Sequence, residues 1–228
     1  MIKIEHTEIV GWEAAIRGMR NPLNSWDKSD SYTTCGNVDT PDGSMGYTFF
    51  AGDNDLDLMK RLSKTGTDHR KFMRMIVVYC DITAPLYWWK EFDTYKVGTV
   101  SNSCSTMHKI HSKEFALDDF SCDHLIDGDW LDDGENVFLP SFACLCETIM
   151  SLNLYRKKFL ETKDKKRWWQ MIQLLPTSYN QKRTVMLNYE VLANIYKSRK
   201  AHKLDEWREL CRWIEGLPYS EIITHESD

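Results

Sequence analysis

One predicted helix carries polar groups at both ends of an apolar stripe. Asn188, Leu192, Ile195 and Arg199 fall within an arc of about 60° on a helical wheel. Because the middle of this stripe is expected to be buried, the amide and the guanidinium at its ends each need a partner. Arg199 is therefore either a helix cap or carboxylate contact, or the centre of a site for an anion or carbonyl oxygen. A guanidinium stays protonated, so Arg199 can stabilise negative charge on a bound oxygen but cannot act as a general base.

A second candidate is the hydroxyl-rich run at residues 99–106, which reads Thr-Val-Ser-Asn-Ser-Cys-Ser-Thr. Hydroxyls and backbone N–H groups can hold a phosphate or pyrophosphate without arginine. The alternative is a helix N-cap run that binds no ligand. Cys104, inside this run, is interpreted as a small packing residue.

Metal and cysteine chemistry have weaker support. The chain has seven cysteines, an odd number without CxxC pairs, which disfavours a disulfide framework and a zinc site, and we expect mostly buried thiols. Residues 117–135 contain eight acidic side chains but lack the twelve-residue calcium pattern, so we predict a solvated loop and no metal. His108, His111 and His202 are interpreted as ordinary surface or core residues.

The composition excludes several classes of protein. The 228 residues include 9 Trp, 10 Tyr and 9 Phe, enough aromatic area for a sizeable core, so a disordered chain is excluded. A net charge of −5 argues against nucleic acid as a partner. No apolar run approaches the roughly 20 residues of a membrane helix, and residues 1–5 do not read as a signal peptide. We expect a cytoplasmic protein without membrane contact, folded as one domain over residues 1–228.

The hydrophobic patterns predict an α+β fold with a mixed central sheet and long helices. Strands are expected at residues 2–5, 47–51 and 73–82, the last of them central, and residues 21–55 form a long surface excursion. Helices are expected at 9–19, 56–65, 142–160 and 168–175, after Pro85 through Phe92, and over 182–217 with a break around 199–204. The tryptophan pairs Trp88-Trp89 and Trp168-Trp169 are expected in core and interface packing rather than on a stacking surface.

The C-terminal motif resembles the signature of the flavin-dependent thymidylate synthases. Leu175-Pro176 precedes Asn188, Leu192, Asn194 and Arg199 at a spacing similar to that of the family. Upstream, a helix, Lys64-Thr65-Gly66, an apolar strand and Ala84-Pro85 resemble the segment that leads to the family's flavin motif. The resemblance covers roughly residues 56–110 and 150–215, more than half of the chain.

This resemblance implies an enzyme that transfers a methylene group from methylenetetrahydrofolate to C5 of dUMP. Reduced FAD would be the hydride source, NADPH would re-reduce the FAD, and the active sites would form between the subunits of a homotetramer. Arg199 would be the catalytic residue, and no protein nucleophile is needed. The implied substrate-binding residues are Glu91, Ser103, Ser105 and Arg199. The implied cofactor-binding residues are His69, Thr94, Tyr95, Lys96, Thr99, Asn102, Asn188 and Asn194.

The chain departs from the family pattern at the phosphate-binding positions. Thr94-Tyr95-Lys96 stands where the family has Arg-His-Arg, Met107 stands where it has a phosphate-binding arginine, and residues 171–174 lack a further arginine. Because arginine forks bind phosphate strongly, Lys96, Lys109 or Arg183 would have to substitute.

Two alternatives therefore stay open. One is a homologue that has kept the fold and some nucleotide or flavin binding but has lost the methylation. The other is a non-enzymatic oligomeric interaction protein whose contact surface is the acidic loop 117–135.

Overall fold

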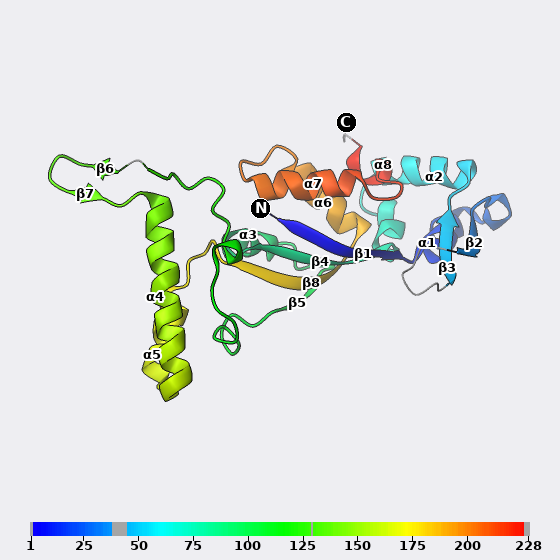
Figure 1. The fold of residues 1–228 in the computed structure, drawn as a ribbon. Coiled ribbons are helices and arrows are strands. Elements are labelled where there is room, and N and C mark those ends of the chain that lie inside the picture. Colours follow the sequence, from blue (N-terminus) through cyan, green and yellow to red (C-terminus); the bar gives the residue numbers. More distant parts are fainter. Residues whose placement is uncertain (1, 38–44, 129, 226–228) are drawn as a thin grey trace. The chain divides into compact units, whose positions relative to one another are not determined.

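A computed structural model of the protein describes residues 2–37, 45–128 and 130–225. The α-helices are α1 (Trp12–Arg20), α2 (Asp53–Lys64), α3 (Leu86–Phe92), α4 (Ser141–Thr162), α5 (Lys165–Leu174), α6 (Tyr189–Arg199), α7 (Asp205–Glu215) and α8 (Glu221–Thr224) (Figure 1). The strands are β1 (Lys3–Val10), β2 (Tyr32–Asn37), β3 (Met45–Phe50), β4 (Val77–Pro85), β5 (Val100–Ser103), β6 (Leu131–Asp132), β7 (Val137–Phe138) and β8 (Asn180–Asn188). Short 3₁₀ helices are η1 (Asn21–Leu23), η2 (Trp26–Lys28), η3 (Arg70–Met75) and η4 (Leu117–Asp119).

The larger sheet has four strands in the order β1-β4-β8-β5, and two-stranded ribbons pair β2 with β3 and β6 with β7. β4 lies in the interior of the larger sheet, as predicted for the apolar segment 73–82. The predicted α+β fold class is confirmed. None of the helices in the described ranges is long and apolar enough to cross a membrane.

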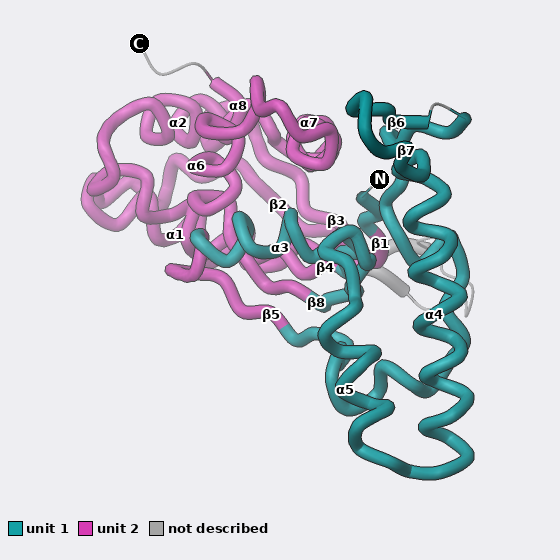
Figure 2. Tube along the Cα trace, turned by 90° about the vertical axis from the view of Figure 1, so that its left-hand side faces the viewer, with its two compact units in different colours: residues 1–4, 81–94, 102–184 teal, residues 5–80, 95–101, 185–228 magenta. Residues whose placement is uncertain are grey.

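The chain divides into two compact units (Figure 2). Unit 1 comprises residues 1–4, 81–94 and 102–184, and unit 2 comprises residues 5–80, 95–101 and 185–228. Each strand of the four-stranded sheet has part of its length in each unit. The single domain expected from the sequence stays a prediction.

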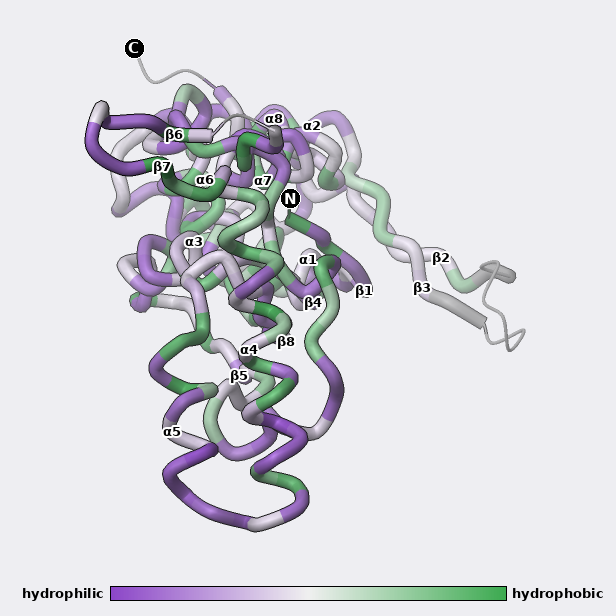
Figure 3. The backbone as a smooth tube through the Cα atoms, turned by 60° about the vertical axis from the view of Figure 1, so that its left-hand side comes forward, coloured by the Kyte–Doolittle hydropathy of each residue, from purple (hydrophilic) through white to green (hydrophobic). Residues whose placement is uncertain are grey.

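Unit 1 contains a helical hairpin in which α4 packs along α5 (Figure 1). Leu145 and Leu152 of α4 and Met171 of α5 are buried in one apolar cluster with Phe115 and Phe120. Hydrophilic residues surround the turn that joins the two helices, where Figure 3 shows the chain mostly purple. The hairpin is therefore held by its apolar seam, and its end is polar.

The aromatic residues of α3 also belong to the core of unit 1. Trp88 and Trp89 are 0% and 1% exposed, and both rings contact Phe92. The indole nitrogen of Trp89 donates a hydrogen bond of 2.9 Å to the Gln181 carbonyl oxygen. The prediction that these tryptophans form core is confirmed.

Unit 2 is built around α6, which packs against η3, α7 and α8. Leu192 and Ile195 are fully buried, as the apolar stripe predicted. Gly11 precedes α1 with a φ of 94°, and a Cβ there would lie 2.0 Å from the Met75 carbonyl oxygen. Only glycine fits this position, because the approach of the two backbone segments leaves no room for a side chain.

The prediction of helix throughout 182–217 is wrong at its start, because residues 180–188 form β8. Val185 and Leu187 are buried while Thr184 is exposed, the period of two expected of a strand. The predicted break is confirmed, since α6 ends at Arg199 and α7 begins at Asp205. Asn188 therefore precedes α6 rather than lying on its apolar face.

Other boundaries differ in smaller ways. Residues 9 and 10 continue β1, β4 begins four residues later than predicted because η3 precedes it, and the surface excursion contains a second strand, β2, that was not predicted. The helices predicted at 56–65, 142–160, 168–175 and after Pro85 are confirmed.

The acidic segment 117–135 forms η4, turns and the β6 strand of a short hairpin. Backbone N–H groups of Glu135 and Asn136 bond the Asp133 carboxylate, which lowers the pKa of that carboxyl group. Asp129 lies outside the described residues. Among the residues that the structure describes, no group of His, Cys, Asp and Glu is arranged to hold a metal ion.

Candidate functional site

Arg199 is held among aromatic side chains of unit 2, at the end of α6. Its Nε donates a hydrogen bond of 3.0 Å to the Tyr95 hydroxyl. Its guanidinium carbon lies 4.7 Å from the ring centre of Trp207, in α7, and the Tyr95 and Trp207 rings meet edge to face at 5.9 Å. Trp207 is fully buried, so the platform under the guanidinium is fixed. A planar cation seated on an indole keeps its charge and its orientation without losing its hydrogen-bonding fork.

Asn188 connects the start of α6 to the segment 95–101, which belongs to the same unit. Its Oδ1 accepts a hydrogen bond of 3.0 Å from the Val191 backbone N–H and so caps the helix. Gly98 has a φ of 80°, and a Cβ there would lie 3.0 Å from Asn188 Nδ2 and 3.2 Å from Val191 Cγ2. Glycine is favoured at this turn because the positive φ is strained for other residues and a Cβ would press on the Asn188 and Val191 side chains.

Thr99 follows this glycine and carries a buried hydroxyl. Its backbone N–H donates to the Lys96 carbonyl oxygen at 3.3 Å and closes the turn. Thr99 Oγ1 is buried and has no hydrogen-bond partner among the described residues. A buried hydroxyl without a partner is costly unless another molecule supplies one, so Thr99 marks a position where a bound group can be recognised.

Asn194 and His69 belong to a different part of unit 2. Asn194 is exposed, and its Oδ1 accepts a hydrogen bond of 3.4 Å from Arg70 Nη2. Arg70 Nε lies 3.3 Å from a carboxylate oxygen of Glu190, which Arg74 also binds. His69 is exposed and precedes Arg70 at the start of η3. A cavity of about 350 Å³ beside these groups is lined by Arg70, Asn194, Lys197 and His225, among other residues.

Unit 1 contains the remaining predicted residues. Glu91 lies on α3 and its carbonyl oxygen accepts a hydrogen bond of 2.7 Å from the Thr94 hydroxyl. Asn102 and Ser103 are exposed on β5. Ser105 Oγ accepts hydrogen bonds from the backbone N–H of His108 at 2.9 Å and of Met107 at 3.3 Å. Part of the hydroxyl-rich run therefore caps a turn, as the alternative interpretation proposed.

Cys104 is bound to β8 through its backbone, and its thiol is exposed. Its N–H donates to the Lys182 carbonyl oxygen at 3.0 Å and its carbonyl oxygen accepts from Gln181 Nε2 at 2.8 Å. The packing role predicted for Cys104 is wrong, because this main-chain pairing turns the side chain away from the core.

The broader prediction of mostly buried thiols is also wrong. Cys80 and Cys211 are buried, Cys122 and Cys146 are half-buried, and Cys35, Cys104 and Cys144 are exposed. The exposed thiols belong to the β2–β3 ribbon, a loop and the first turn of α4, none of which buries that side. Burial raises the pKa of the Cys211 thiol to about 11, so this residue is a core group rather than a nucleophile.

Arg183 is committed to contacts within unit 1. Its Nη1 binds Asp93 at 2.8 Å, its Nε donates to Gln181 Oε1 at 3.0 Å, and its guanidinium lies 4.1 Å from the centre of the Trp89 ring. Breaking these contacts to bind a phosphate would cost the charge pair and the stacking together. Arg183 is therefore a poor substitute for the missing arginines.

The structure brings together part of the predicted set. Within unit 2 it joins Arg199 to Tyr95, and Asn188 to the turn that contains Thr99, whereas Asn194 and His69 flank Arg70. Lys96 is exposed in the same turn. Sequence reasoning missed Trp207. A usable signal was present, because Trp207 is an aromatic residue in the first turn of the helix that follows Arg199 after a short loop. Sequence reasoning also missed Arg70 and Glu190, whose pairing depends on two segments far apart in the chain.

The fold of this chain is similar to that of nucleotide-methylating enzymes in solved structures. Flavin-dependent thymidylate synthase ThyX from Helicobacter pylori, complexed with FAD and dUMP, matches with a TM-score of 0.64 and 15% identity over 98% of both chains. A second structure of that enzyme with FAD and dUMP matches with a TM-score of 0.65 and 15% identity, over 99% of this chain and 98% of the other.

The UMP/dUMP methylase PolB from Streptomyces cacaoi, bound with 5-Br dUMP, matches with a TM-score of 0.58 and 12% identity, over 97% of this chain and 92% of the other. No protein-family model matches the sequence, and a search of curated proteins finds no significant match. The resemblance drawn from the C-terminal motif is thus confirmed at the level of the fold.

Proposed function

We propose that this protein is a divergent flavin-dependent thymidylate synthase. It would transfer a methylene group from methylenetetrahydrofolate to C5 of dUMP, with reduced FAD as hydride donor and NADPH as the source of the electrons. The observation that carries the proposal is the position of Arg199. This motif residue lies at the end of α6, and Tyr95 and Trp207 fix its guanidinium. The fold shared with ThyX along 98% of the chain supports the same conclusion.

The described residues fit a flavin. Thr99 offers a buried hydroxyl without a protein partner, beside the Gly98 turn and the Asn188 amide. We infer that the cofactor is held by His69, Thr94, Tyr95, Lys96, Thr99, Asn102, Asn188 and Asn194. FAD supplies hydride chemistry when it is bound, and the protein supplies binding, orientation and electrostatics.

Arg199 is the proposed catalytic residue. When C5 of the pyrimidine becomes nucleophilic, negative charge develops on the ring and its carbonyl oxygens, and a guanidinium beside such an oxygen stabilises it. Tyr95 and Trp207 are positioning residues, because they fix the guanidinium before substrate binds. Glu91, Ser103 and Ser105 are proposed to bind the substrate. No thiol is required in this scheme.

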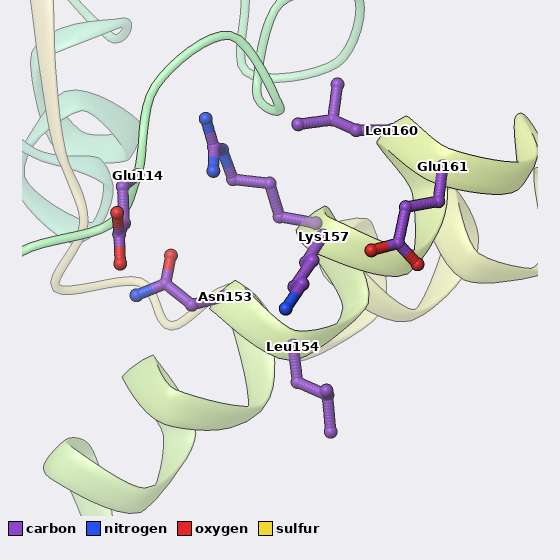
Figure 4. Close-up of a pocket in the computed structure, with 7 residues that line it drawn as sticks. Glu114, Asn153, Leu154, Lys157, Leu160 and Glu161 are labelled. Atoms are coloured by element: carbon purple, nitrogen blue, oxygen red, sulfur yellow. The ribbon is translucent and has the colours of Figure 1, made fainter.

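We also propose a homotetramer, on the evidence of the exposed apolar residues of the α4–α5 hairpin. Met150, Leu154 and Leu160 of α4 are 57%, 53% and 37% exposed. Figure 4 shows Leu154 and Leu160 on α4 beside a hollow of about 530 Å³. Met150 and Leu154 are four residues apart and therefore lie on one side of α4, and exposed apolar residues grouped in this way are typical of protein interfaces. Light scattering of the purified protein tests this: a monomer or a dimer would contradict it.

The proposed activity is tested by loading the purified protein with FAD and recording its visible spectrum and melting temperature. We expect a yellow protein with a raised melting temperature that forms dTMP from dUMP when methylenetetrahydrofolate and NADPH are supplied. A colourless protein with an unchanged melting temperature and no dTMP overturns the proposal. Flavin binding without turnover instead favours the homologue that has kept the fold and lost the methylation.

A further inference from the structure

A cavity of about 540 Å³ in unit 1 is lined by the hydroxyl-rich run, the residues that follow it and the start of β8. Its lining includes the Cys104 thiol, the Ser105 and Thr106 hydroxyls and three lysines, Lys109, Lys113 and Lys182. Two aspartates, Asp118 and Asp119, also line it, which leaves one net positive charge. The cavity size falls in the range of small-molecule sites, about 300–1,000 Å³, and exceeds the need of an inorganic ion.

The three lysines differ in their partners. Lys113 forms an ion pair with Asp119, whose hydrogen bond raises the pKa of the Lys113 ammonium. Lys182 Nζ lies 3.0 Å from a carboxylate oxygen of Asp81. Lys109 forms no ion pair with any residue that the structure describes. The positive charge available to a ligand is therefore that of Lys109.

The hydroxyls complete a set of donors. Ser105 Oγ accepts two backbone N–H bonds, so its own O–H hydrogen is available to a ligand oxygen. Thr106 contributes a second hydroxyl to the lining and is half-buried. One ammonium and two hydroxyls form a donor set that suits a phosphate group without any arginine.

We propose that this cavity binds the phosphate of a nucleotide, with Lys109 as the paired cation and Ser105 and Thr106 as hydroxyl donors. Naming dUMP as that nucleotide rests on the proposed function, whereas the anion site itself does not. The site explains how phosphate can be bound by a chain that has Met107 and residues 171–174 without arginine, and whose Arg183 is already engaged.

The first test uses Cys104 as a reporter inside the cavity. Purified protein is alkylated with iodoacetate, an anion, and separately with iodoacetamide, which is neutral, and the rates at each cysteine are followed by peptide mass spectrometry. Cys35 and Cys144, also exposed, are internal references outside the cavity. We expect a higher ratio of iodoacetate to iodoacetamide rates at Cys104 than at the references.

Substituting Lys109→Gln should lower the ratio at Cys104 by about threefold, the size expected of one nearby unit charge in water. The ratios at Cys35 and Cys144 should not change. Lys71→Gln, which removes an exposed lysine of unit 2, is the matched control and should leave all three ratios unchanged. An unchanged ratio at Cys104 in the Lys109→Gln protein overturns the anion site, whether or not the protein binds flavin.

The second test identifies the source of the phosphate, by calorimetric titration with dUMP, with deoxyuridine and with FAD. Lys109→Gln should weaken dUMP binding by roughly 10- to 100-fold, as expected for loss of a charged hydrogen bond, and should leave deoxyuridine binding within about twofold. Lys109→Arg should restore most of the dUMP affinity. Equal losses for dUMP and deoxyuridine overturn a phosphate contact, and a loss confined to FAD overturns the assignment to dUMP.

Failure of the two proposals can be told apart. A protein that binds no flavin and forms no dTMP, yet keeps a Lys109-dependent iodoacetate preference at Cys104, retains the anion site and loses the proposed function. A protein that forms dTMP with no such preference has the function without this site.

Discussion

The molecule presents positive charge in two different ways. In unit 2 the Arg199 guanidinium is held by Tyr95 and Trp207, and in unit 1 the Lys109 ammonium lines the cavity described above. Arg199 is fixed by a hydroxyl and lies on a buried indole, so its orientation is set before any ligand arrives. Lys109 is an exposed, flexible ammonium whose two lysine neighbours are neutralised by carboxylates. A fixed fork suits charge that develops at one atom during a reaction, whereas a mobile ammonium suits a phosphate that carries its charge throughout.

The largest expected effect tests whether the indole beneath Arg199 is part of the buried core. Trp207→Ala should lower the free energy of unfolding by about 3–5 kcal/mol, because it removes a fully buried indole. Urea denaturation monitored by circular dichroism measures this. Trp130→Ala, which removes an indole that is 60% exposed, is the control and should change stability by less than about 0.5 kcal/mol. If the loss of unfolding free energy in Trp207→Ala is as small as that expected for Trp130→Ala, Trp207 is not a structural platform for Arg199.

Arg199→Ala should reduce kcat for dTMP formation by about 10²- to 10³-fold, the usual loss when a group that stabilises developing charge is removed. The unfolding free energy should change far less than in Trp207→Ala. Arg61→Ala on the exposed side of α2 is the matched arginine control and should retain activity. Activity within twofold of the unaltered protein would remove Arg199 from the mechanism.

Tyr95→Phe separates positioning from charge. It keeps the ring beside Trp207 and deletes only the hydroxyl that binds Arg199 Nε, so we expect a three- to tenfold loss of kcat/KM, corresponding to about 0.5–1.5 kcal/mol for one hydrogen bond. Steady-state kinetics at fixed flavin saturation measures this. A loss as large as that of Arg199→Ala would show that the Tyr95 hydroxyl does more than position Arg199.

The smallest expected effect concerns the lysines of the cavity that form ion pairs with carboxylates. Asp119→Asn should release Lys113 from its ion pair and add positive charge to the lining, tightening dUMP binding by about two- to fivefold. Because the pKa of Lys113 is raised, its ion pair with Asp119 should persist as the pH rises through the ordinary lysine range and be lost only above it. Unchanged or weaker binding in Asp119→Asn would show that the lysines do not act on a common anion.

Local patterns predicted the helices well, because the hydrogen bonds and side-chain contacts of a helix join residues near in sequence. α2, α4 and α5 lie where apolar periodicity and the flanking Gly66 and Pro176 placed them. The same reasoning failed at 182–188, where residues with a helix-compatible pattern become β8. Strand pairing is decided by partners far along the chain, and no local pattern reports them.

The sequence by itself determined the motif that ends at Arg199, the break that follows it and the absence of arginine at 94, 96 and 107. These are statements of residue type and spacing, which chain order alone carries. Only the tertiary structure decided that Trp207 lies beneath Arg199, that Thr99 buries a hydroxyl without a partner among the described residues, and that Lys113 and Lys182 are paired with carboxylates whereas Lys109 forms no ion pair with a described residue. Each depends on a contact, or the lack of one, between segments far apart in the chain. Burial and charge pairing are set by which residues are neighbours in the folded structure, and the order of residues along the chain does not specify them.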